Sequence, residues 1–527
     1  MEKILILDFG GQYTQLIARR VRELNVFSEI VDYDITIDEI IEKSPKAIIL
    51  SGGYDSVYGN RSIKPCKDIW NLNIPILGIC YGFQIMIQEN GGSVINNKES
   101  EEYGSTSIRL FPKNKLFKNI TEFNECWMSH SDSVDIMPSN FKIIATTEKC
   151  KVAAACNETK KFYGVQFHPE VTQTVFGNQL LKNFLINICG FKCDWKPSNF
   201  KLDVINKIKE EVKDSYVLCA ISGGVDSLVA AVLTAQAIGD KLYCVFVDHG
   251  MLRKNEVNEV CDLLRSLIGK NIFLVKQEEI FLSKLKGVED PEEKRKIIGK
   301  TFIDSFEKVS RKLNVPFKFL LQGTIYPDIV ESGTKFSKTI KSHHNVGGLP
   351  EKLNFSLLEP LKYLFKDEVR QLGLSLGIPK NNIYRQPFPG PGLAVRIIGE
   401  INKEKIEIVQ ESDYLFRNFI DELYKDNDKK PWQYFTVLTN SKTVGVVGDN
   451  RKYGYTLVLR AVDTVDAMSA KWFKIPLNEL EKISSIICNK IPAINRVVYD
   501  ITNKPPGTIE WESVSYTHLT LPTIYSV

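Results

Sequence analysis

The sequence lacks several features that would place it quickly in a class of proteins. It has no run of about 18 apolar residues, the length that a membrane-spanning helix needs. Acids at Glu2 and Asp8 interrupt the start of the chain, so we expect no secretory signal. The 11 cysteines include no C-x-x-C pair, which argues against a disulfide framework and a zinc site. We therefore expect a cytoplasmic protein with no membrane segment.

An excess of one charge is also missing. Lys and Arg number 68 against 64 Asp and Glu, which leaves a net charge of +4 without blocks of one sign. Such a balance gives no reason to expect a nucleic-acid partner. The 527 residues, 43% of them hydrophobic, are too many for one core, and a prior of about 150 residues per domain predicts a multidomain protein.

The most informative stretch is a glycine turn between a strand pattern and a helix pattern. Residues 217–221 form a short apolar run, Ser222-Gly-Gly-Val-Asp-Ser227 follows, and residues 228–238 are rich in helix formers. Two glycines and a helix N-terminus direct several N–H groups to one point, which predicts a phosphate site. The turn lacks the Gly-Lys-Ser/Thr ending of a Walker loop, so that class of nucleotide triphosphatase is disfavoured.

Asp226 lies inside this predicted phosphate site. A carboxylate repels a phosphate unless a divalent cation bridges them, so we expect Mg²⁺ at Asp226. The hexapeptide resembles the loop of the pyrophosphatase-loop family, whose members cleave ATP between the α and β phosphates. This resemblance implies the following ATP contacts: Ser222, Gly223, Gly224, Val225, Asp226, Ser227, Leu228 and Val247.

The N-terminal part carries a candidate nucleophile. Apolar strand patterns alternate with helix patterns from Lys3 onward, which predicts a parallel sheet with flanking helices. Gly78-Ile-Cys80-Tyr-Gly82 then has the spacing of a nucleophile elbow, and the helix N-terminus after it favours the thiolate. His168-Pro-Glu170 ends a later strand pattern and supplies a base with its orienting carboxylate. Each residue alone is more often structural, but together they predict a catalytic site.

This part resembles the class I glutamine amidotransferases. The resemblance implies that Cys80 is the nucleophile, His168 the general base and Glu170 its partner. The glycine turn Ser51-Gly-Gly53 and the N–H of Tyr81 are the predicted oxyanion hole, assigned to Gly53 and Tyr81. The sequence departs from the family at Tyr54 and Ser131, where Pro and Gly are usual; both changes concern the rim of the glutamine pocket.

The middle of the chain continues the alternation of strands and helices. Asp248 ends a buried strand pattern, where ligands of open α/β sheets bind. Residues 287–299 carry charges of both signs between glycines, which suits either a mobile lid or a solvated helix start. The adjacent His343 and His344 lack Cys or Glu at ligand spacing, so a role in hydrogen bonding or substrate contact is favoured over metal binding.

Over residues 1–512 the motifs together resemble the glutamine-hydrolysing GMP synthase family. Besides the triad and the loop, they include residues 290–299, 322–328, 341–350 and 387–393. The resemblance implies that ATP adenylylates xanthosine monophosphate (XMP) and that ammonia from glutamine then displaces AMP to give GMP. It also implies a set of XMP contacts: Arg253, Gln433, Asp449, Lys504, Ile509 and Glu510.

The predicted fold class is α/β with three domains. Residues 1–192 are the glutaminase, residues 199–386 a doubly wound ATP pyrophosphatase domain with a parallel sheet, and residues 387–512 an α+β module for XMP binding and homodimer formation. In that module we expect strands at 434–438, 443–447 and 455–462, and helices near 465–472 and 477–489. Residues 513–527 depart from the family and are predicted to be a non-native tail; if XMP binding needs a free chain end, the hypothesis is that this tail impairs it.

Other readings of the motifs are less favoured. Asparagine synthetases place their glutaminase cysteine at the mature N-terminus, where this chain has Glu2 after Met1, and NAD synthetases use a different glutaminase. Thiouridine-forming relatives need paired cysteines near the loop, but Cys219 and Cys244 fall within buried strand patterns. A binding or regulatory protein without catalytic turnover is disfavoured, because both the triad and the phosphate loop are intact.

Overall fold

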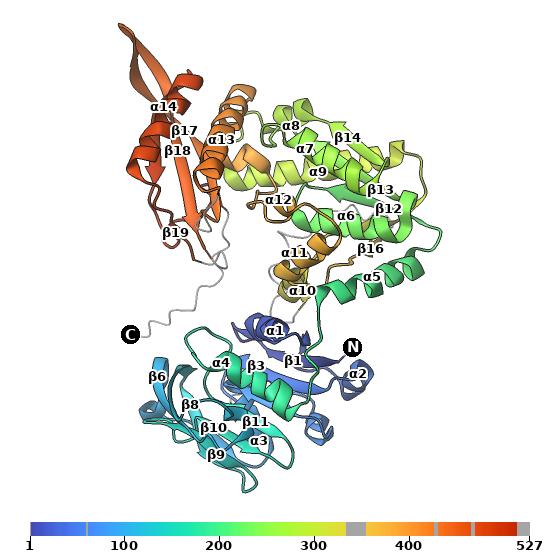
Figure 1. Ribbon diagram of the computed structural model, residues 1–527, viewed down its shortest axis with the longest axis vertical. Helices are drawn as coiled ribbons and strands as arrows, with labels where there is room; N and C mark the ends of the chain where they lie inside the picture. The colour runs from blue at the N-terminus through green and yellow to red at the C-terminus, as the bar shows by residue number, and fades with distance from the viewer. Residues whose placement is uncertain (1, 59–61, 334–354, 426–429, 465–468, 514–527) are drawn as a thin grey trace. The chain divides into compact units, whose positions relative to one another are not determined.

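The computed structural model describes residues 2–58, 62–333, 355–425, 430–464 and 469–513. The chain divides into two compact units (Figure 1). The first contains residues 1–200 with two short segments, 325–345 and 362–365, and the second contains the remainder. His343 and His344, whose role was predicted above, lie outside the described residues, as do residues 514–527.

The first unit is built on a nine-stranded sheet with the order β2-β1-β3-β4-β11-β10-β9-β6-β7. Strands β2, β1, β3, β4 and β11 are parallel neighbours, and the rest pair antiparallel. The strands are β1 (Lys3–Phe9), β2 (Phe27–Asp32), β3 (Ala47–Gly53), β4 (Ile76–Ile79), β6 (Glu102–Leu110), β7 (Phe123–His130), β9 (Lys142–Thr147), β10 (Ala154–Asn157) and β11 (Phe162–Val165). A small second sheet pairs β5 (Ser93–Asn96) with β8 (Asp132–Ile136).

Helices cover the parallel half of this sheet. They are α1 (Thr14–Glu23), α2 (Ile37–Lys43), α3 (Tyr81–Glu89) and α4 (Gly177–Lys182). The strands β1, β3 and β4 are buried along almost their whole length, as expected for parallel strands with covered faces. The predicted strand-helix alternation from Lys3 onward is therefore confirmed.

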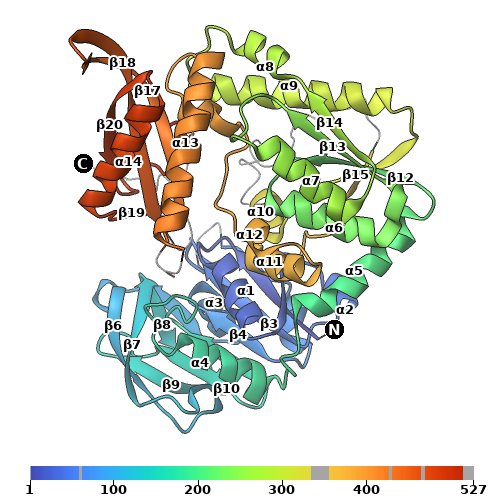
Figure 2. The same ribbon diagram turned by 45° about the horizontal axis from the view of Figure 1, so that its top comes forward.

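The second unit contains a five-stranded parallel sheet with the order β14-β13-β12-β15-β16. Its strands are β12 (Tyr216–Ile221), β13 (Leu242–Asp248), β14 (Ile272–Lys276), β15 (Phe317–Leu321) and β16 (Ser356–Leu358). Figure 2 shows helices α6 (Val225–Ile238), α7 (Glu256–Ile268) and α9 (Pro291–Lys312) packed around this sheet. The other helices here are α5 (Pro197–Val212), α8 (Glu278–Leu285), α11 (Lys366–Ser375) and α12 (Lys380–Ile383), while α10 (Tyr326–Gly333) belongs to the first unit.

The strand order reverses direction between β12 and β15. Strand β12 comes first in the sequence; β13 and β14 lie on one side of it, and β15 and β16 lie on the other. Ligands of open α/β sheets bind at the carboxyl ends of strands at such a switch point. The turn that follows β12, the predicted phosphate loop, is therefore at the expected binding edge.

The C-terminal part of the second unit is α+β, as predicted. Strands β17 (Gln433–Val447) and β18 (Asn450–Asp463) form a long hairpin, visible in Figure 1, that pairs with β19 (Lys471–Trp472) and β20 (Ile494–Asp500). Helices α13 (Lys403–Leu423) and α14 (Leu477–Lys490) accompany this sheet. The helix predicted at 465–472 is wrong in its described part, because residues 471–472 pair with β18 as a strand. Residues 434–438 and 443–447 belong to one continuous strand.

Residues 287–299 form the start of a helix. The Asp290 side chain accepts hydrogen bonds from the N–H groups of Glu292 and Glu293, at 3.0 and 2.8 Å, and Pro291 occupies the first turn. This is a well-formed N-cap with a proline at a favoured position. The stretch is therefore a helix start, but it is not solvated throughout: Lys294 is fully buried, with Nζ 3.0 and 2.8 Å from the two carboxylate oxygens of Glu512.

Candidate functional site: a thiol elbow and a phosphate loop

Cys80 lies on a sharp turn between β4 and α3. Its backbone has φ 51° and ψ −108°, an unusual conformation for a residue other than glycine. A Cβ at Gly78 would lie 2.6 Å from the carbonyl oxygen of Gly82, and one at Gly82 would lie 2.4 Å from that of Leu50. Both glycines are therefore required by close backbone contacts, which explains the predicted G-x-C-x-G spacing.

The predicted triad partners lie beside the thiol. The ring Nδ1 of His168 is 2.7 Å from Oε1 of Glu170, and both side chains are buried. Burial acts to lower the pKa of His168, but the Glu170 carboxylate and the neighbouring Cys80 outweigh it and raise that pKa well above its ordinary value. A Cβ at Gly52 would lie 3.3 Å from the His168 ring and 4.0 Å from Cβ of Cys80. This arrangement suits a thiol nucleophile with an imidazole base.

The predicted oxyanion-hole residues are also neighbours. A Cβ at Gly53 would lie 2.7 Å from the Tyr81 ring, so the Gly53 backbone packs against that residue. The N–H of Tyr81 is the first of α3 and has no partner within the helix. Tyr54 is 63% exposed, in keeping with a place at a rim.

A glutamine that contacts the thiol, and a second glutamine that bonds the first, were not singled out by the sequence analysis. The Nε2 group of Gln166 donates to Sγ of Cys80 at 3.7 Å, and Gln84 donates to Oε1 of Gln166 at 3.2 Å. Both side chains are buried. Gln166 follows the strand that precedes His168, and a polar residue within that apolar run was the available signal. The carbonyl of Ser129, 3.7 Å from Sγ, is a further contact of the thiol.

The second site is the turn between β12 and α6. Gly223 has φ +77° and Gly224 is the N-cap residue of α6. Oγ of Ser222 accepts a hydrogen bond from the N–H of Gly224 at 3.3 Å and lies 3.2 Å from Oγ of Ser227. A Cβ at Gly323, after β15, would lie 2.8 Å from the backbone nitrogen of Ser227. The loop therefore has the open backbone and hydroxyl groups that a phosphate needs.

The sequence analysis predicted Asp226 but not the side chain that pairs with it. Nζ of Lys366 lies 2.8 and 2.6 Å from the two carboxylate oxygens of Asp226. Lys366 is the first residue of α11, and the sequence analysis did not identify it. Arg385 was also missed: it donates to the carbonyl oxygen of Gly223 at 2.9 Å and bonds the Glu256 carboxylate. Val247, another predicted ATP contact, is buried in β13, and Leu228 is buried in α6.

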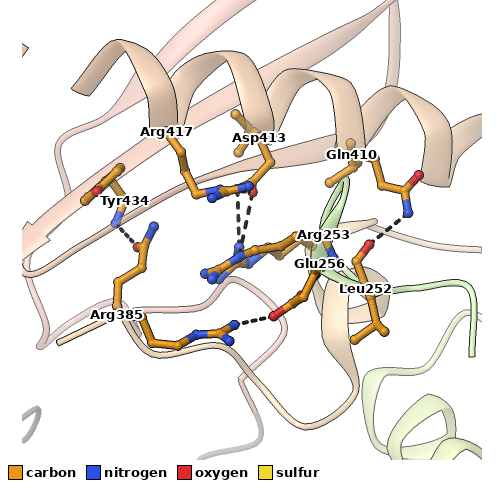
Figure 3. Close-up of polar contacts among 12 residues, drawn as sticks. Leu252, Arg253, Glu256, Arg385, Gln410, Asp413, Arg417 and Tyr434 are labelled. Carbon is orange, nitrogen blue, oxygen red and sulfur yellow. Dashed lines mark hydrogen bonds and ion pairs between the residues drawn. The ribbon is translucent and has the colours of Figure 1, made fainter. Parts of the chain in front are cut away.

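Arg253, a predicted XMP contact, lies in a buried cluster of charges. Figure 3 shows its guanidinium directed at Asp413, with Nε 3.9 Å from Oδ2, while Arg417 approaches the same carboxylate at 2.7 Å. Burial lowers the pKa of Arg253 to about 9 although Asp413 opposes that change. An arginine with an incompletely paired, buried guanidinium is suited to an anionic ligand.

Gln433 and Glu510, two more predicted XMP contacts, meet each other. Arg396, which is fully buried, donates to both carboxylate oxygens of Glu510, at 3.1 and 2.8 Å. Gln433 donates to the same carboxylate at 2.9 Å. Gln433 and Arg253 each approach the carbonyl oxygen of Pro387 at 3.4 Å, which connects the two groups of side chains.

The remaining predicted XMP contacts are more scattered. Ile509 packs against the apolar group that includes Phe435. The backbone of Lys504 forms an isolated bridge with Ala470, and its side chain is half-buried. Asp449 is exposed at the turn between β17 and β18, at the opposite end of the hairpin from Gln433. The structure therefore does not bring Asp449 together with Gln433 and Glu510 within one chain.

Among the described residues, no helix is both long enough and apolar enough to cross a lipid bilayer.

Comparisons with known proteins match both ends of the chain. The family model of class I glutamine amidotransferases matches residues 5–188, and that of the GMP synthase C-terminal domain matches residues 421–511. A GMP synthase (glutamine-hydrolysing) of Malacoplasma penetrans is 78% identical over 512 residues, which covers 97% of this chain and 100% of the relative. Proteins of the same name from Clostridium tetani and Clostridium botulinum are each 54% identical and cover 97% of this chain and 99% of the relative.

The identity and coverage of these relatives, together with the thiol elbow and the phosphate loop, show that this chain belongs to the family of glutamine-hydrolysing GMP synthases.

Proposed function

We propose that this chain forms GMP from XMP, with ATP as co-substrate and glutamine as the source of nitrogen. The observation that carries the proposal is the presence of two chemically separate sites in one chain, a triad at Cys80 and a phosphate loop at Asp226. Free ammonia is largely protonated near neutral pH, so producing it in the same protein that consumes it favours its capture.

In the glutaminase half-reaction, His168 accepts the proton of the Cys80 thiol. The sulfur attacks the side-chain amide carbon of glutamine, and the N–H groups of Gly53 and Tyr81 receive the developing oxyanion. His168, held by Glu170, then gives its proton to the departing ammonia. Water cleaves the resulting thioester and releases glutamate. The raised pKa of His168 favours the imidazolium that this proton transfer creates.

In the synthetase half-reaction, the loop at residues 222–228 receives the ATP phosphates. The 2-oxygen of XMP attacks the α-phosphorus, and pyrophosphate leaves. Ammonia then attacks carbon 2 of the adenylylated base and displaces AMP. Lys366 bonds the Asp226 carboxylate, and Arg385 bonds the carbonyl oxygen of Gly223. Both cations are positioned to offset the negative charge of the phosphates at the loop.

Mg²⁺ fits the residues at this loop, and Asp226 is the residue that would hold it. Mg²⁺ is commonly bound by one or two carboxylates together with substrate phosphates and water. When bound, it supplies positive charge that offsets the phosphates. The Asp226 carboxylate is partly exposed and pairs with the ammonium group of Lys366. Mg²⁺ is able to displace that ammonium group from the carboxylate. Asp226→Asn should cripple AMP formation and its dependence on Mg²⁺; near-normal AMP formation would contradict this role.

For XMP we propose the surroundings of Arg253, Gln433 and Glu510 as the nucleotide site, with Lys504 opposite its phosphate. The functional modules are then residues 1–192, 199–386 and 387–512. We also propose a cytoplasmic homodimer formed through the last module, where Val444, Val446 and Tyr453 are exposed on the β17–β18 hairpin. Sedimentation at several concentrations measures the assembly, and a concentration-independent monomer would contradict it.

The experiment for the whole proposal uses purified full-length protein with glutamine, ATP, XMP and Mg²⁺. Glutamate, pyrophosphate, AMP and GMP are each measured, and XMP or ATP is omitted in turn. We expect GMP and pyrophosphate in equal amounts, and neither without XMP. Release of glutamate with no pyrophosphate under any condition would refute the coupling. The same assay on a chain truncated after Glu512 tests whether residues 513–527 impair XMP use.

A further inference from the structure

Three side chains with metal-binding atoms meet in the first unit, outside the triad. Glu102 begins β6, His130 ends β7, and Cys150 lies in the turn after β9. A carboxylate oxygen, an imidazole nitrogen and the sulfur all lie within 4.8 Å of one another. The three residues are 6%, 4% and 1% exposed. Glu102 and His130 are direct partners across the β6–β7 ladder, so the sheet register fixes their separation.

The imidazole of His130 has one nitrogen directed into this group without a hydrogen bond. Its Nδ1 lies 3.0 Å from the carbonyl oxygen of Asp132, an acceptor, so Nδ1 carries the proton. In the neutral ring Nε2 then presents a lone pair. Within the described part of the chain, no hydrogen-bond partner is found for this buried nitrogen. A histidine that donates one N–H to a backbone carbonyl and directs the other nitrogen inward has the arrangement of a metal ligand.

One hydroxyl group contacts both of the other two residues. The hydroxyl of Thr147 donates to the Glu102 carboxylate, with oxygen separations of 2.8 and 3.0 Å. The same hydroxyl accepts the backbone N–H of Cys150 at 2.8 Å. The Glu102 carboxylate therefore has an outer hydrogen-bond partner, as is usual around bound metal ions, and the same hydroxyl holds the backbone of Cys150.

An ion pair between a protonated His130 and Glu102 is the simpler explanation. The nitrogen and oxygen are 3.6 Å apart, too far for the hydrogen bond that a buried pair needs. It also gives no role to the Cys150 sulfur, which lies within 4.8 Å of both of these groups. In a tetrahedral zinc site neighbouring donor atoms lie about 3.3–3.8 Å apart, so a small side-chain shift would complete the geometry.

We propose that Glu102, His130 and Cys150 bind a borderline-soft divalent cation of the zinc type, with water as the fourth ligand. One carboxylate, one imidazole and one thiolate are donors that such cations accept, whereas Mg²⁺ disfavours sulfur. The missing C-x-x-C pair predicted no zinc site, but these ligands come from three separate segments that only the folded sheet joins.

The site adjoins the glutaminase centre. His130 follows Ser129, whose carbonyl contacts the Cys80 thiol, and its Nδ1 is anchored by the backbone of Asp132. The Asp132 side chain in turn accepts hydrogen bonds from Tyr58 and Asn96, at 2.9 and 3.0 Å. A cation bound by His130 would therefore stiffen the corner between β7 and β8 beside the nucleophile.

The test uses Co²⁺ as the probe because a cobalt–thiolate bond gives an intense near-ultraviolet absorption. Full-length protein carrying Cys80→Ala is used throughout, so that the catalytic thiol adds no signal. Cys150→Ser removes the proposed sulfur ligand with little change in volume. Cys156→Ser is the matched control, because Cys156 is a buried cysteine of β10 whose side chain contacts Asn114, and it lies outside the three-residue group.

We expect one Co²⁺ per chain and the charge-transfer band in the parent and in Cys156→Ser. In Cys150→Ser the band should vanish and the affinity should fall by at least about 100-fold, more than the loss of an outer partner costs. Zn²⁺ should raise the melting temperature of the parent and the control but not that of Cys150→Ser. Equal bands with and without Cys150, or no band in any variant, would overturn the proposal.

Discussion

The thiol of Cys80 is held by neighbours that stand apart from its triad partners. Gln166 donates its amide N–H to the sulfur, and Gln84 bonds the oxygen of the same amide and so fixes which way it faces. An amide donor favours the thiolate over the thiol, because it stabilises negative charge on sulfur. Gln166 is therefore a positioning residue of the proposed nucleophile.

Replacing Gln166 with leucine should slow glutamine hydrolysis selectively. Loss of one preorganised donor costs about 10²-fold in comparable sites, so we expect a fall of roughly 10- to 100-fold in kcat for glutamate release. Ammonium-dependent GMP formation is the internal control and should remain within about twofold of the parent. Equal losses in both activities would mean that the variant damages folding rather than the thiol.

His249 is a buried histidine whose charge is suppressed. Burial lowers its pKa to about 4, against the raising effects of Asp248 and Glu256, and its Nδ1 accepts a hydrogen bond from the N–H of Met251 at 3.1 Å. An unfolded chain protonates histidine near pH 6.5. The folded state therefore binds fewer protons between pH 6.5 and 4, and this group reduces the free energy of unfolding as pH falls through that window, by up to about 3 kcal/mol.

A histidine-selective NMR titration tests this prediction directly. The sequence has six histidines, so the His249 signal is assigned by its disappearance in His249→Gln. We expect that signal to stay neutral from pH 8 down to about 5. The His168 signal is the opposite control, since its pKa is raised above the ordinary value. A midpoint near 6.5 for His249 would contradict the assigned burial effect.

At the scale of elements, the first site depends on how closely strand β4 and helix α3 approach their neighbours. The elbow at Cys80 leaves no space for a side chain at Gly78 or Gly82, because backbone atoms occupy that space. The strained φ of Cys80 is then maintained by the packing of both elements.

Gly82→Ala should therefore destabilise the first unit by at least about 2 kcal/mol and abolish glutamine hydrolysis, because its Cβ would lie 2.4 Å from a carbonyl oxygen. Gly299→Ala is the matched control. Gly299 lies within helix α9 with nothing within 4 Å of its added Cβ, so alanine should stabilise that helix by about 0.5–1 kcal/mol. Thermal unfolding and glutamate release measure both. Normal activity in Gly82→Ala would refute the steric argument.

At the scale of the whole molecule, the two sites should be separable by a single change. Cys80→Ala removes the proposed nucleophile and leaves the phosphate loop untouched. We expect glutamine-dependent GMP formation to fall by more than about 10³-fold, while synthesis from added ammonium continues at the parent rate. Loss of both activities would show that the sites do not divide the reaction in this way.

Local sequence was enough to predict much of this chain. The α/β fold class and the family are confirmed, because strand-loop-helix patterns and glycine spacings act over a few residues. The helix expected near 465–472 failed where long-range pairing with β18 decided the conformation of Lys471 and Trp472. The individual site residues and the domain boundaries stay predictions.

The sequence by itself determined the two motifs of this protein, because the elbow and the phosphate loop each consist of a few consecutive residues. Only the tertiary structure decided which distant side chains join them. Lys366 reaches Asp226, Gln166 reaches Cys80, and Glu102, His130 and Cys150 converge in one core. The physical reason is that sheet register and strand order fix these contacts, and neither leaves a local pattern in the sequence.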